Sequence, residues 1–248
     1  MAQPDHAHAD IGIVSALPIE MSAFLSRCER VRKYSDGGFV FRGGIYDGVK
    51  IAIAESKVGF ARARKATEQL IQTHTPNWIL SCGLSGALQQ EMKCGDIVVG
   101  DSLVDSHGQE IRLDINLPAD SENGLYVGRL LTSDEMVRTV DEKRSLAEST
   151  QAIAVDMESL AVAQIAKERQ TGFMAIRAIS DDMKTDLPAE ILSIIGSTGN
   201  VRIGAAIGSV WKRPGSVKDL WYLRENANRA TAQLANFLDG VIKQLSGK

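Results

Sequence analysis

Short apolar runs that alternate with helix-like stretches constrain the fold of this chain more than any other feature of its sequence. Runs 11–16, 78–82 and 173–179 have the length and the apolar character of buried strands. Stretches 137–148 and 157–167 have the composition of helices. Because strands and helices interleave in this way, we predict an α/β fold around a mixed central β-sheet.

Turn residues divide the rest of the chain into further elements. Segments 38–42 and 49–55 are separated by Gly-Gly and Asp-Gly pairs, which are typical of hairpin turns, so we expect paired strands. We expect a turn at 83–86 and a long terminal helix at 220–245. The apolar stretch 191–211 is interrupted by glycines and an arginine, which is too broken for a membrane span. We therefore expect it to form a helical cover over the sheet.

Length and composition favour one large domain. The 248 residues are 44% hydrophobic and 24% charged, as in an ordinary globular protein with enough apolar material for a core. We predict a flexible N-terminal tail at 1–10 and a single domain at 11–248, in which 182–248 is an extended C-terminal helical region. His6 and His8 lie on the predicted tail without a third ligand, so they indicate no metal site.

Charge, cysteine count and absent motifs exclude several classes of function. The net charge of -3 lacks the basic surplus of a nucleic-acid-binding protein, so we expect no nucleic-acid partner. Three cysteines without CxxC spacing indicate neither a disulfide framework nor a zinc site. With no apolar leader and no uninterrupted apolar span, the chain is predicted to be cytoplasmic, without stable membrane insertion. The dinucleotide, P-loop and zincin motifs are absent, so we expect neither a cofactor nor a metal.

Acidic residues at the ends of apolar elements are the main candidates for chemistry. Glu20 follows the first predicted strand, Glu158 opens an apolar helix, and Asp181 closes the strand at 173–179. Sites in α/β sheets gather outside the carboxyl ends of strands, so the three carboxylates are expected to converge. The structural alternative is that Glu20 and Glu158 favour helix N-termini and that Asp181 is a helix N-cap.

The stretch 83–87, GLSGA, approaches the G-x-S-x-G nucleophile elbow of serine hydrolases. Its last glycine is replaced by Ala87, and the only downstream histidine, His107, falls in an expected loop. A serine hydrolase is therefore a weak alternative.

Four motifs, in order and nearly without gaps, resemble the purine nucleoside phosphorylase and nucleosidase superfamily, in particular the methylthioadenosine/S-adenosylhomocysteine nucleosidases. The motifs are IGIVSALPIE (11–20), CGDIVV (94–99), VDME (155–158) and RAISD (177–181). The resemblance implies a single-domain, three-layer fold of nucleoside phosphorylase type, a nucleoside substrate and a homodimer.

Further segments resemble the hopanoid-biosynthesis-associated branch of that superfamily. They are 131–137, 154–159, Leu187-Pro188 and 212–214. That branch is thought to remove adenine from adenosylhopane, so the resemblance implies a bulky apolar 5′ group on the substrate. The apolar stretch 191–211 is then expected to line a channel for this group.

The resemblance also implies roles for the three acids. Asp181 matches the residue that delivers a proton to N7 of the purine, and Ser180 and Arg177 are expected to support it. Glu158 matches the residue that binds the ribose hydroxyls, and Glu20 the one that orients or deprotonates the attacking water. These roles suit a reaction that builds positive charge on the ribose and negative charge on the leaving base.

The remaining predicted site residues are expected to contact the sugar and the base of the substrate. Met157 is expected under the sugar, and Met136 and Val137 beside adenine, where Met136 replaces the family's aromatic ring. Ordinary core packing is the alternative for both methionines. Ser85 and Gly86 complete the predicted substrate-binding residues.

The nucleophile is predicted to be water. Phosphorylases of the superfamily carry an arginine and a hydroxyl where this chain has Ser81 and Leu84, although the nucleosidases usually have serine in place of Leu84. Arg62, Arg64 and Lys57 are potential phosphate ligands, but a mixed basic helix usually faces solvent. A phosphorylase and a non-catalytic purine-binding protein remain alternatives to the hydrolase.

Overall fold

The computed structural model describes residues 8–189, 191 and 215–247, and for 215–222 it describes the backbone alone. The strands are β1 (Ile11–Ser15), β2 (Glu29–Asp36), β3 (Phe39–Tyr46), β4 (Val49–Glu55), β5 (Trp78–Ala87), β6 (Ile97–Asp105), β7 (Glu110–Arg112), β8 (Leu125–Thr132), β9 (Ala154–Asp156) and β10 (Gly172–Asp181). The helices are α1 (Pro18–Leu25), α2 (Phe60–His74), α3 (Val140–Thr150), α4 (Ser159–Glu168) and α7 (Gly215–Leu245), with a 3-10 turn at Ser121–Asn123.

All ten strands belong to one sheet, and the sheet has two parts. Strand β5 pairs in parallel with β10, and these two strands close a ring of pairings through β6, β8 and β9. From β5 the sheet continues as an open ribbon through β1, β4, β3 and β2. Parallel and antiparallel pairs both occur, which confirms the predicted mixed sheet.

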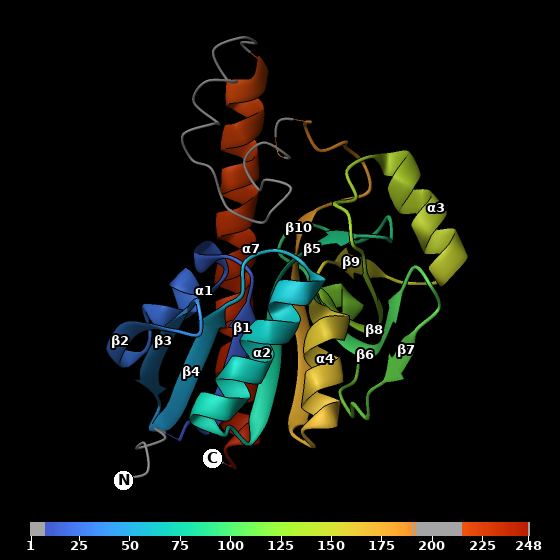
Figure 1. Ribbon diagram of the computed structural model, residues 1–248. Coiled ribbons are helices and arrows are strands. Elements are labelled where there is room, and N and C mark those ends of the chain that lie inside the picture. Colours follow the sequence, from blue (N-terminus) through green and yellow to red (C-terminus); the bar gives the residue numbers. More distant parts are fainter. Residues whose placement is uncertain (1–7, 190, 192–214, 248) are drawn as a thin grey trace, which may run out of the picture.

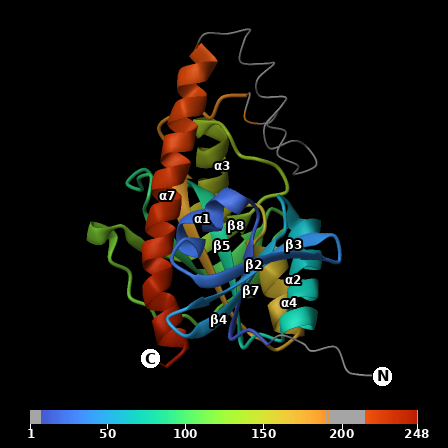
Figure 2. The same cartoon turned by 90° about the vertical axis from the view of Figure 1, so that its left-hand side faces the viewer.

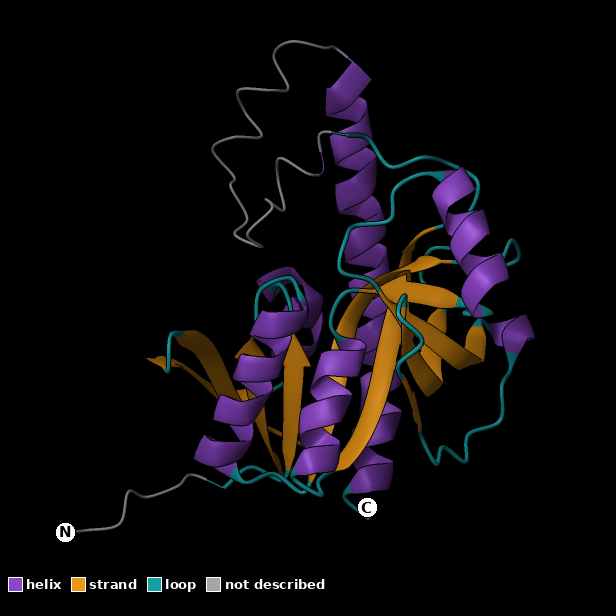
Figure 3. Ribbon diagram, turned by 45° about the vertical axis from the view of Figure 1, so that its right-hand side comes forward, coloured by secondary structure: helices purple, strands orange, loops and turns teal. Residues whose placement is uncertain are grey.

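Helices cover both faces of the open part of the sheet (Figures 1, 2 and 3). On one face α1 and α7 pack against alternate strand residues such as Ile13 and Ile53. On the other face α2 and α4 pack against the intervening residues, such as Val14 and Ala54. This period of two is what a strand buried on both faces requires. The predicted three-layer α/β fold is confirmed.

Three boundaries differ from the sequence-based expectation. The predicted turn at 83–86 is wrong, because β5 continues to Ala87 and pairs there with β9 and β10. Strand β2 was not predicted, since it is exposed, charged and lacks an apolar face. The terminal helix begins at Gly215 rather than at 220.

The N-terminal boundary also lies earlier than predicted. Ala9 is buried, and its backbone N–H donates to the carbonyl of His74 at 3.0 Å. The carboxylate of Asp10 accepts from the Lys50 N–H at 2.7 Å. Ala9 and Asp10 therefore belong to the domain, and the rest of the predicted tail, 1–7, lies outside the described residues.

The expected helical cover at 191–211 lies outside the described residues except for Ile191. Within the described parts of the chain, no helix has the length and apolar character that crossing a membrane requires.

Candidate active site

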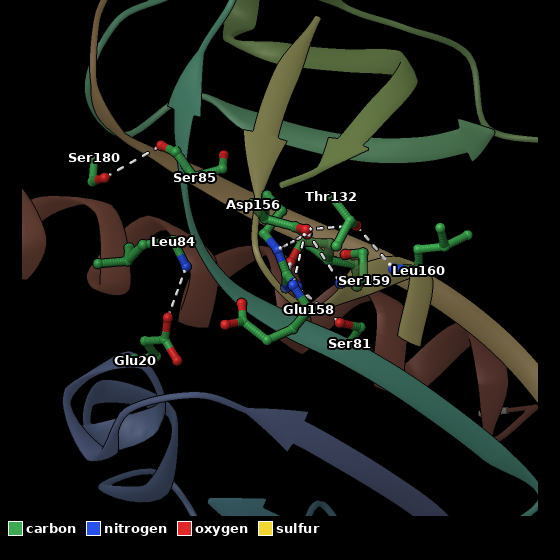
Figure 4. Close-up of polar contacts among 12 residues, drawn as sticks. Glu20, Ser81, Leu84, Ser85, Thr132, Asp156, Glu158, Ser159, Leu160 and Ser180 are labelled. Atoms are coloured by element: carbon green, nitrogen blue, oxygen red, sulfur yellow. Dashed lines mark hydrogen bonds and ion pairs between the residues drawn. The ribbon is translucent and has the colours of Figure 1, made fainter. Parts of the chain in front are cut away.

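The carboxyl-terminal half of β5 connects the parts of the candidate site. The Leu84 N–H donates to Oε1 of Glu20 at 3.1 Å, and the Ser85 carbonyl accepts from the Ser180 hydroxyl at 3.2 Å (Figure 4). The next residue, Gly86, pairs with Asp181 in the β5–β10 ladder. Consecutive strand residues are about 3.3 Å apart, so Leu84, Ser85 and Gly86 lie within about two such steps of each other.

Glu20 is buried at the N-terminus of α1. Its Oε2 accepts from the Leu17 N–H at 2.8 Å and from the Ser15 hydroxyl at 3.1 Å, so it caps the helix. Burial raises the pKa of Glu20 above its ordinary value, and the hydrogen bonds from Leu17, Leu84 and Ser15 oppose this effect. Glu20 therefore stabilises the start of a helix, as the structural alternative expects, and the same carboxylate contacts the carboxyl-terminal half of β5.

Glu158 is buried at the start of α4, and its side chain points to the side on which Glu20 lies (Figure 4). Its Oε1 accepts from the Gly59 N–H at 2.8 Å. Burial and the neighbouring Asp156 carboxylate raise the pKa of Glu158 to about 8. Burial therefore favours the uncharged acid, a form that can both donate and accept hydrogen bonds with sugar hydroxyls.

Asp156, which was not predicted as a site residue, caps α4 in place of Glu158. Its Oδ1 accepts from the N–H groups of Glu158 and Ser159 at 3.1 and 3.2 Å and from the Thr132 hydroxyl at 2.9 Å. Asp156 thereby leaves the Glu158 carboxyl free of a capping role. The signal in the sequence was an acid three positions before the start of the apolar helix at Ser159, from which a side chain can accept the N–H groups two and three positions further on, as a helix N-cap does.

Arg177 is 2% exposed and holds Asp156 rather than Asp181. Its Nε donates to Oδ2 of Asp156 at 2.7 Å, and a second guanidinium nitrogen donates to the Ser81 hydroxyl at 2.8 Å. The expectation that Arg177 supports Asp181 is therefore wrong. A register shift between Ile179 and Asp181 breaks the alternation of β10, so side-chain directions beyond Ile179 do not follow from Arg177.

Asp181 ends β10 with its side chain 14% exposed. Its Oδ1 accepts from the Ser180 hydroxyl at 2.7 Å, and this shorter bond shares the single hydroxyl hydrogen with the contact to the Ser85 carbonyl at 3.2 Å. Its Oδ2 accepts from the Lys143 ammonium at 2.5 Å. No helix begins within 182–189, so the helix-cap interpretation of Asp181 does not apply.

Lys143 on α3 is the residue that the sequence interpretation missed. Its side chain is 0% exposed. A signal was present, because Val140, Lys143 and Ala147 share one face of a helix by their spacing. A lysine within an apolar stripe is rarely buried without a charge partner.

Two glycines of β5 leave room for the acids. A Cβ on Gly83 would lie 2.7 Å from Oε1 of Glu20, and a Cβ on Gly86 would lie 3.0 Å from Oδ2 of Asp181. Any larger residue would displace the neighbouring carboxylate. Gly86 therefore contributes to the site by leaving room for the Asp181 carboxylate.

Ser85 is buried, and its hydroxyl has no hydrogen-bond partner among the described residues. Buried polar atoms are nearly always paired, so this hydroxyl is available to a ligand. His107 lies in an exposed turn after β6, which argues against the serine-hydrolase alternative.

The three predicted apolar contacts differ in their surroundings. Val137 packs against a buried cluster that includes Leu131 and Val155. Met136 and Met157 are half-buried and belong to none of the hydrophobic clusters that the described residues form. Core packing therefore explains Val137 but neither methionine.

Within the described ranges, no three histidine, cysteine, aspartate or glutamate side chains gather as a metal site would require. The charges of the site come from the three acids, from Asp156 and from their two cationic partners, Arg177 and Lys143.

The chain belongs to the phosphorylase superfamily, because the model of that family matches residues 10–122 and 119–201. Two curated relatives are named 5′-methylthioadenosine/S-adenosylhomocysteine nucleosidase. The one from Shewanella loihica is 22% identical over 215 residues, which cover 77% of this chain and 94% of the relative. The one from Listeria innocua is 27% identical over 199 residues, which cover 69% and 85%. The chain is thus an enzyme-family member whose curated relatives are nucleosidases, as the sequence motifs indicated.

Solved structures share the fold. A 5′-methylthioadenosine/S-adenosylhomocysteine nucleosidase from Helicobacter pylori matches with a TM-score of 0.70 at 20% identity, covering 96% of this chain and 99% of that chain. A futalosine hydrolase from the same organism matches with a TM-score of 0.69 at 20% identity, covering 94% and 97%. The predicted nucleoside phosphorylase-type architecture is confirmed.

Proposed function

We propose that the protein is a nucleosidase that hydrolyses the N-glycosidic bond of a 5′-substituted adenosine and releases adenine. The observation that carries the proposal is the meeting of Glu20, Ser180 and Asp181 with three consecutive residues of β5. Glu158 lies beside this group, with its side chain on the side of Glu20 (Figure 4). The names of the curated relatives support the reaction class.

Each acid is assigned one step of the proposed reaction. Asp181 is partly exposed and gives a proton to N7 of the leaving base. Glu158, whose pKa is raised by burial and by the Asp156 carboxylate, exchanges hydrogen bonds with the ribose hydroxyls. Glu20 takes a proton from the attacking water, and the burial that raises its pKa makes it a stronger base than an exposed carboxylate. Ser85, Met136, Val137 and Met157 complete the proposed substrate contacts.

We propose water as the nucleophile. Ser81, which replaces the phosphorylase arginine, is already bonded to Arg177. Arg64 is bonded to Gln164 and Glu168, on the outer side of α2 and α4. One observation favours the phosphorylase alternative: a guanidinium nitrogen of Arg62, near the N-terminus of α2, is buried without a partner among the described residues.

The substrate is proposed to carry a bulky apolar 5′ group, and adenosylhopane is the specific candidate. This assignment rests on the tail motifs Leu187-Pro188 and 212–214 together with the apolar stretch 191–211. The relatives named above act on smaller 5′ groups by their names, and futalosine hydrolase shares the fold, so a panel of substrates has to decide.

An adenine-release assay over 5′-modified adenosines, with and without inorganic phosphate, tests these proposals. We expect phosphate-independent release of adenine and free ribose, with faster cleavage of an adenosine bearing a long apolar 5′ chain than of methylthioadenosine. A rate that rises with phosphate and yields ribose-1-phosphate would establish the phosphorylase instead. Binding of adenine without cleavage of any nucleoside would identify a non-catalytic purine-binding protein.

We also propose a cytoplasmic homodimer, as the family resemblance implies. Sedimentation equilibrium distinguishes the 26.8 kDa chain from an assembly of twice that mass. A monomer at micromolar concentration would contradict the dimer.

A further inference from the structure

Lys143 is the one residue of α3 whose side chain is buried. Its Nζ donates to Oδ2 of Asp181 and to the carbonyl of Asp182, each at 2.5 Å. The next basic residue of the same helix, Arg144, is exposed and pairs with Asp141 on the helix surface. The helix therefore places one of two adjacent cations against the end of β10 and the other in solvent.

Stability alone does not account for a buried lysine at this position. Val140 and Ala147 occupy the same helical face, and an apolar residue between them would continue the stripe. Replacing a buried ion pair by apolar residues of similar volume is often neutral or stabilising. A lysine at position 143 thus points to a role in what Asp181 does.

We propose that Lys143 is a positioning residue for Asp181 in the cleavage of the glycosidic bond, an inference that rests on the proposed function. Lys143 holds Oδ2 while the Ser180 hydroxyl holds Oδ1. Each carboxyl oxygen has two lone-pair directions, so one direction on each oxygen stays open for the base and its proton. The two donors together fix the plane of the carboxyl group.

The ammonium also faces the charge that the reaction leaves on Asp181. The N9–C1′ bond breaks with its electron pair moving to the base, and the proton of the Asp181 carboxyl moves to N7. The water oxygen bonds to C1′ and gives one proton to the Glu20 carboxylate, which returns it to Asp181 through solvent. Lys143 keeps its own proton throughout and pairs with the Asp181 carboxylate that the transfer creates.

Gly86 supplies independent geometric support. A Cβ at this position would lie 3.0 Å from Oδ2 of Asp181 and 3.5 Å from Cε of Lys143. Strand β5 therefore contacts the ion pair itself, and the pair lies at the same strand end as Glu20. Lys143 is in this way part of the site rather than of a distant surface.

The test is a double-mutant cycle that measures adenine release. Lys143→Met removes the ammonium and keeps an unbranched apolar stem. We expect kcat to fall about 100-fold with KM within about threefold of wild type, because Lys143 acts through the proton donor and not on the substrate. The double variant Lys143→Met/Asp181→Asn should lie within about threefold of Asp181→Asn alone, since Lys143 has no task once the acid is gone.

Two measurements separate this role from a structural one. Arg144→Met, which removes the exposed cation of the same helix, should leave kcat within about twofold of wild type. Calorimetric binding of a 7-deaza analogue of the substrate, which lacks the N7 acceptor, should be within about threefold for wild type and Lys143→Met.

Three results would overturn the inference while the wild type remains a nucleosidase. They are an unchanged kcat in Lys143→Met, losses that multiply in the double variant, and a parallel loss of kcat and 7-deaza binding, which includes failure to fold. A wild type that releases no adenine from any nucleoside would instead overturn the proposed function.

Discussion

The two halves of the candidate site place their acids in different electrostatic surroundings. Glu20 and Glu158 are buried and accept hydrogen bonds from backbone N–H groups. Their pKa values are raised because the effect of burial outweighs the effect of those hydrogen bonds. Asp181 is partly exposed and is bonded directly to an ammonium. Carboxyl groups with different surroundings thus lie near the same end of β5. Proteins use such differences in surroundings to give acid and base roles to side chains of the same type.

The largest effect on catalysis is expected from removing Asp181, the acid that is bonded to an ammonium. Asp181→Asn should lower kcat for adenine release by about 1,000-fold, within the range that general acid catalysis contributes. Steady-state kinetics checks this. The neighbouring Asp182→Asn is the control, because Asp182 meets Lys143 through its carbonyl oxygen and not its carboxylate. Similar losses in both variants would contradict the assignment of Asp181.

Breaking the buried ion pair between Arg177 and Asp156 should mainly affect the stability of the fold. Arg177→Met leaves Asp156 buried without its cation, and such a loss costs about 3–5 kcal/mol. Urea unfolding measures the change. The matched control Arg144→Met breaks an exposed pair and should cost no more than about 1 kcal/mol. Equal stability of the two variants would show that the buried pair is dispensable.

The two glycines of β5 allow the halves to be disturbed one at a time. Gly83→Ala should displace Glu20 and Gly86→Ala should displace Asp181, since each new Cβ meets the carboxylate at 3.0 Å or less. We expect kcat to fall about tenfold in each variant, because a misplacement of this size weakens catalysis by about tenfold or more. Crystal structures of the two variants check the displacements. If the same carboxylate moved in both variants, Glu20 and Asp181 would not be held separately by the two glycines.

Much of this arrangement was readable in the sequence. The three acids were proposed because strand ends in an α/β sheet meet at one edge. The pairing of β3 and β4 followed from Asp47-Gly48, whereas the expected turn at Gly43-Gly44 is wrong, because both glycines pair within β3. The partners of the acids were not found. Lys143 and Asp181 are 38 positions apart, and Arg177 and Asp156 are 21 apart, so only the folded chain shows which cation serves which acid.

Local irregularity explains the other errors. The register shift at the end of β10 cannot be seen in an apolar run, and it redirects Asp181 relative to Arg177. The glycines at 83–86 looked like a turn because glycine is common in turns. In the structure both glycines allow the close approach of a carboxylate within a continuous strand.

A separate effect is expected in the pH dependence of stability. The folded-state pKa of Glu158 is about 8 against an ordinary 4.5, so the folded protein binds more protons than the unfolded chain between these values. Its stabilising contribution is full below pH 4.5 and is lost as pH rises toward 8, by at most about 1.4 kcal/mol per pH unit.

Glu158→Gln should remove this part of the decline. Urea unfolding at several values between pH 5 and 9 measures the free energy of unfolding of both proteins, and their difference isolates Glu158 from Glu20, whose raised pKa acts in the same direction. Parallel curves for the two proteins would mean that Glu158 is ionised throughout, as an ordinary surface acid would be.

The double duty of Glu20 limits how this enzyme can diverge. One carboxylate begins α1 and also reaches the backbone of β5, so a substitution of Glu20 removes a helix cap and a contact to the strand at the same time. Loss of the role proposed for Glu20 is therefore coupled to a loss of stability at the start of α1.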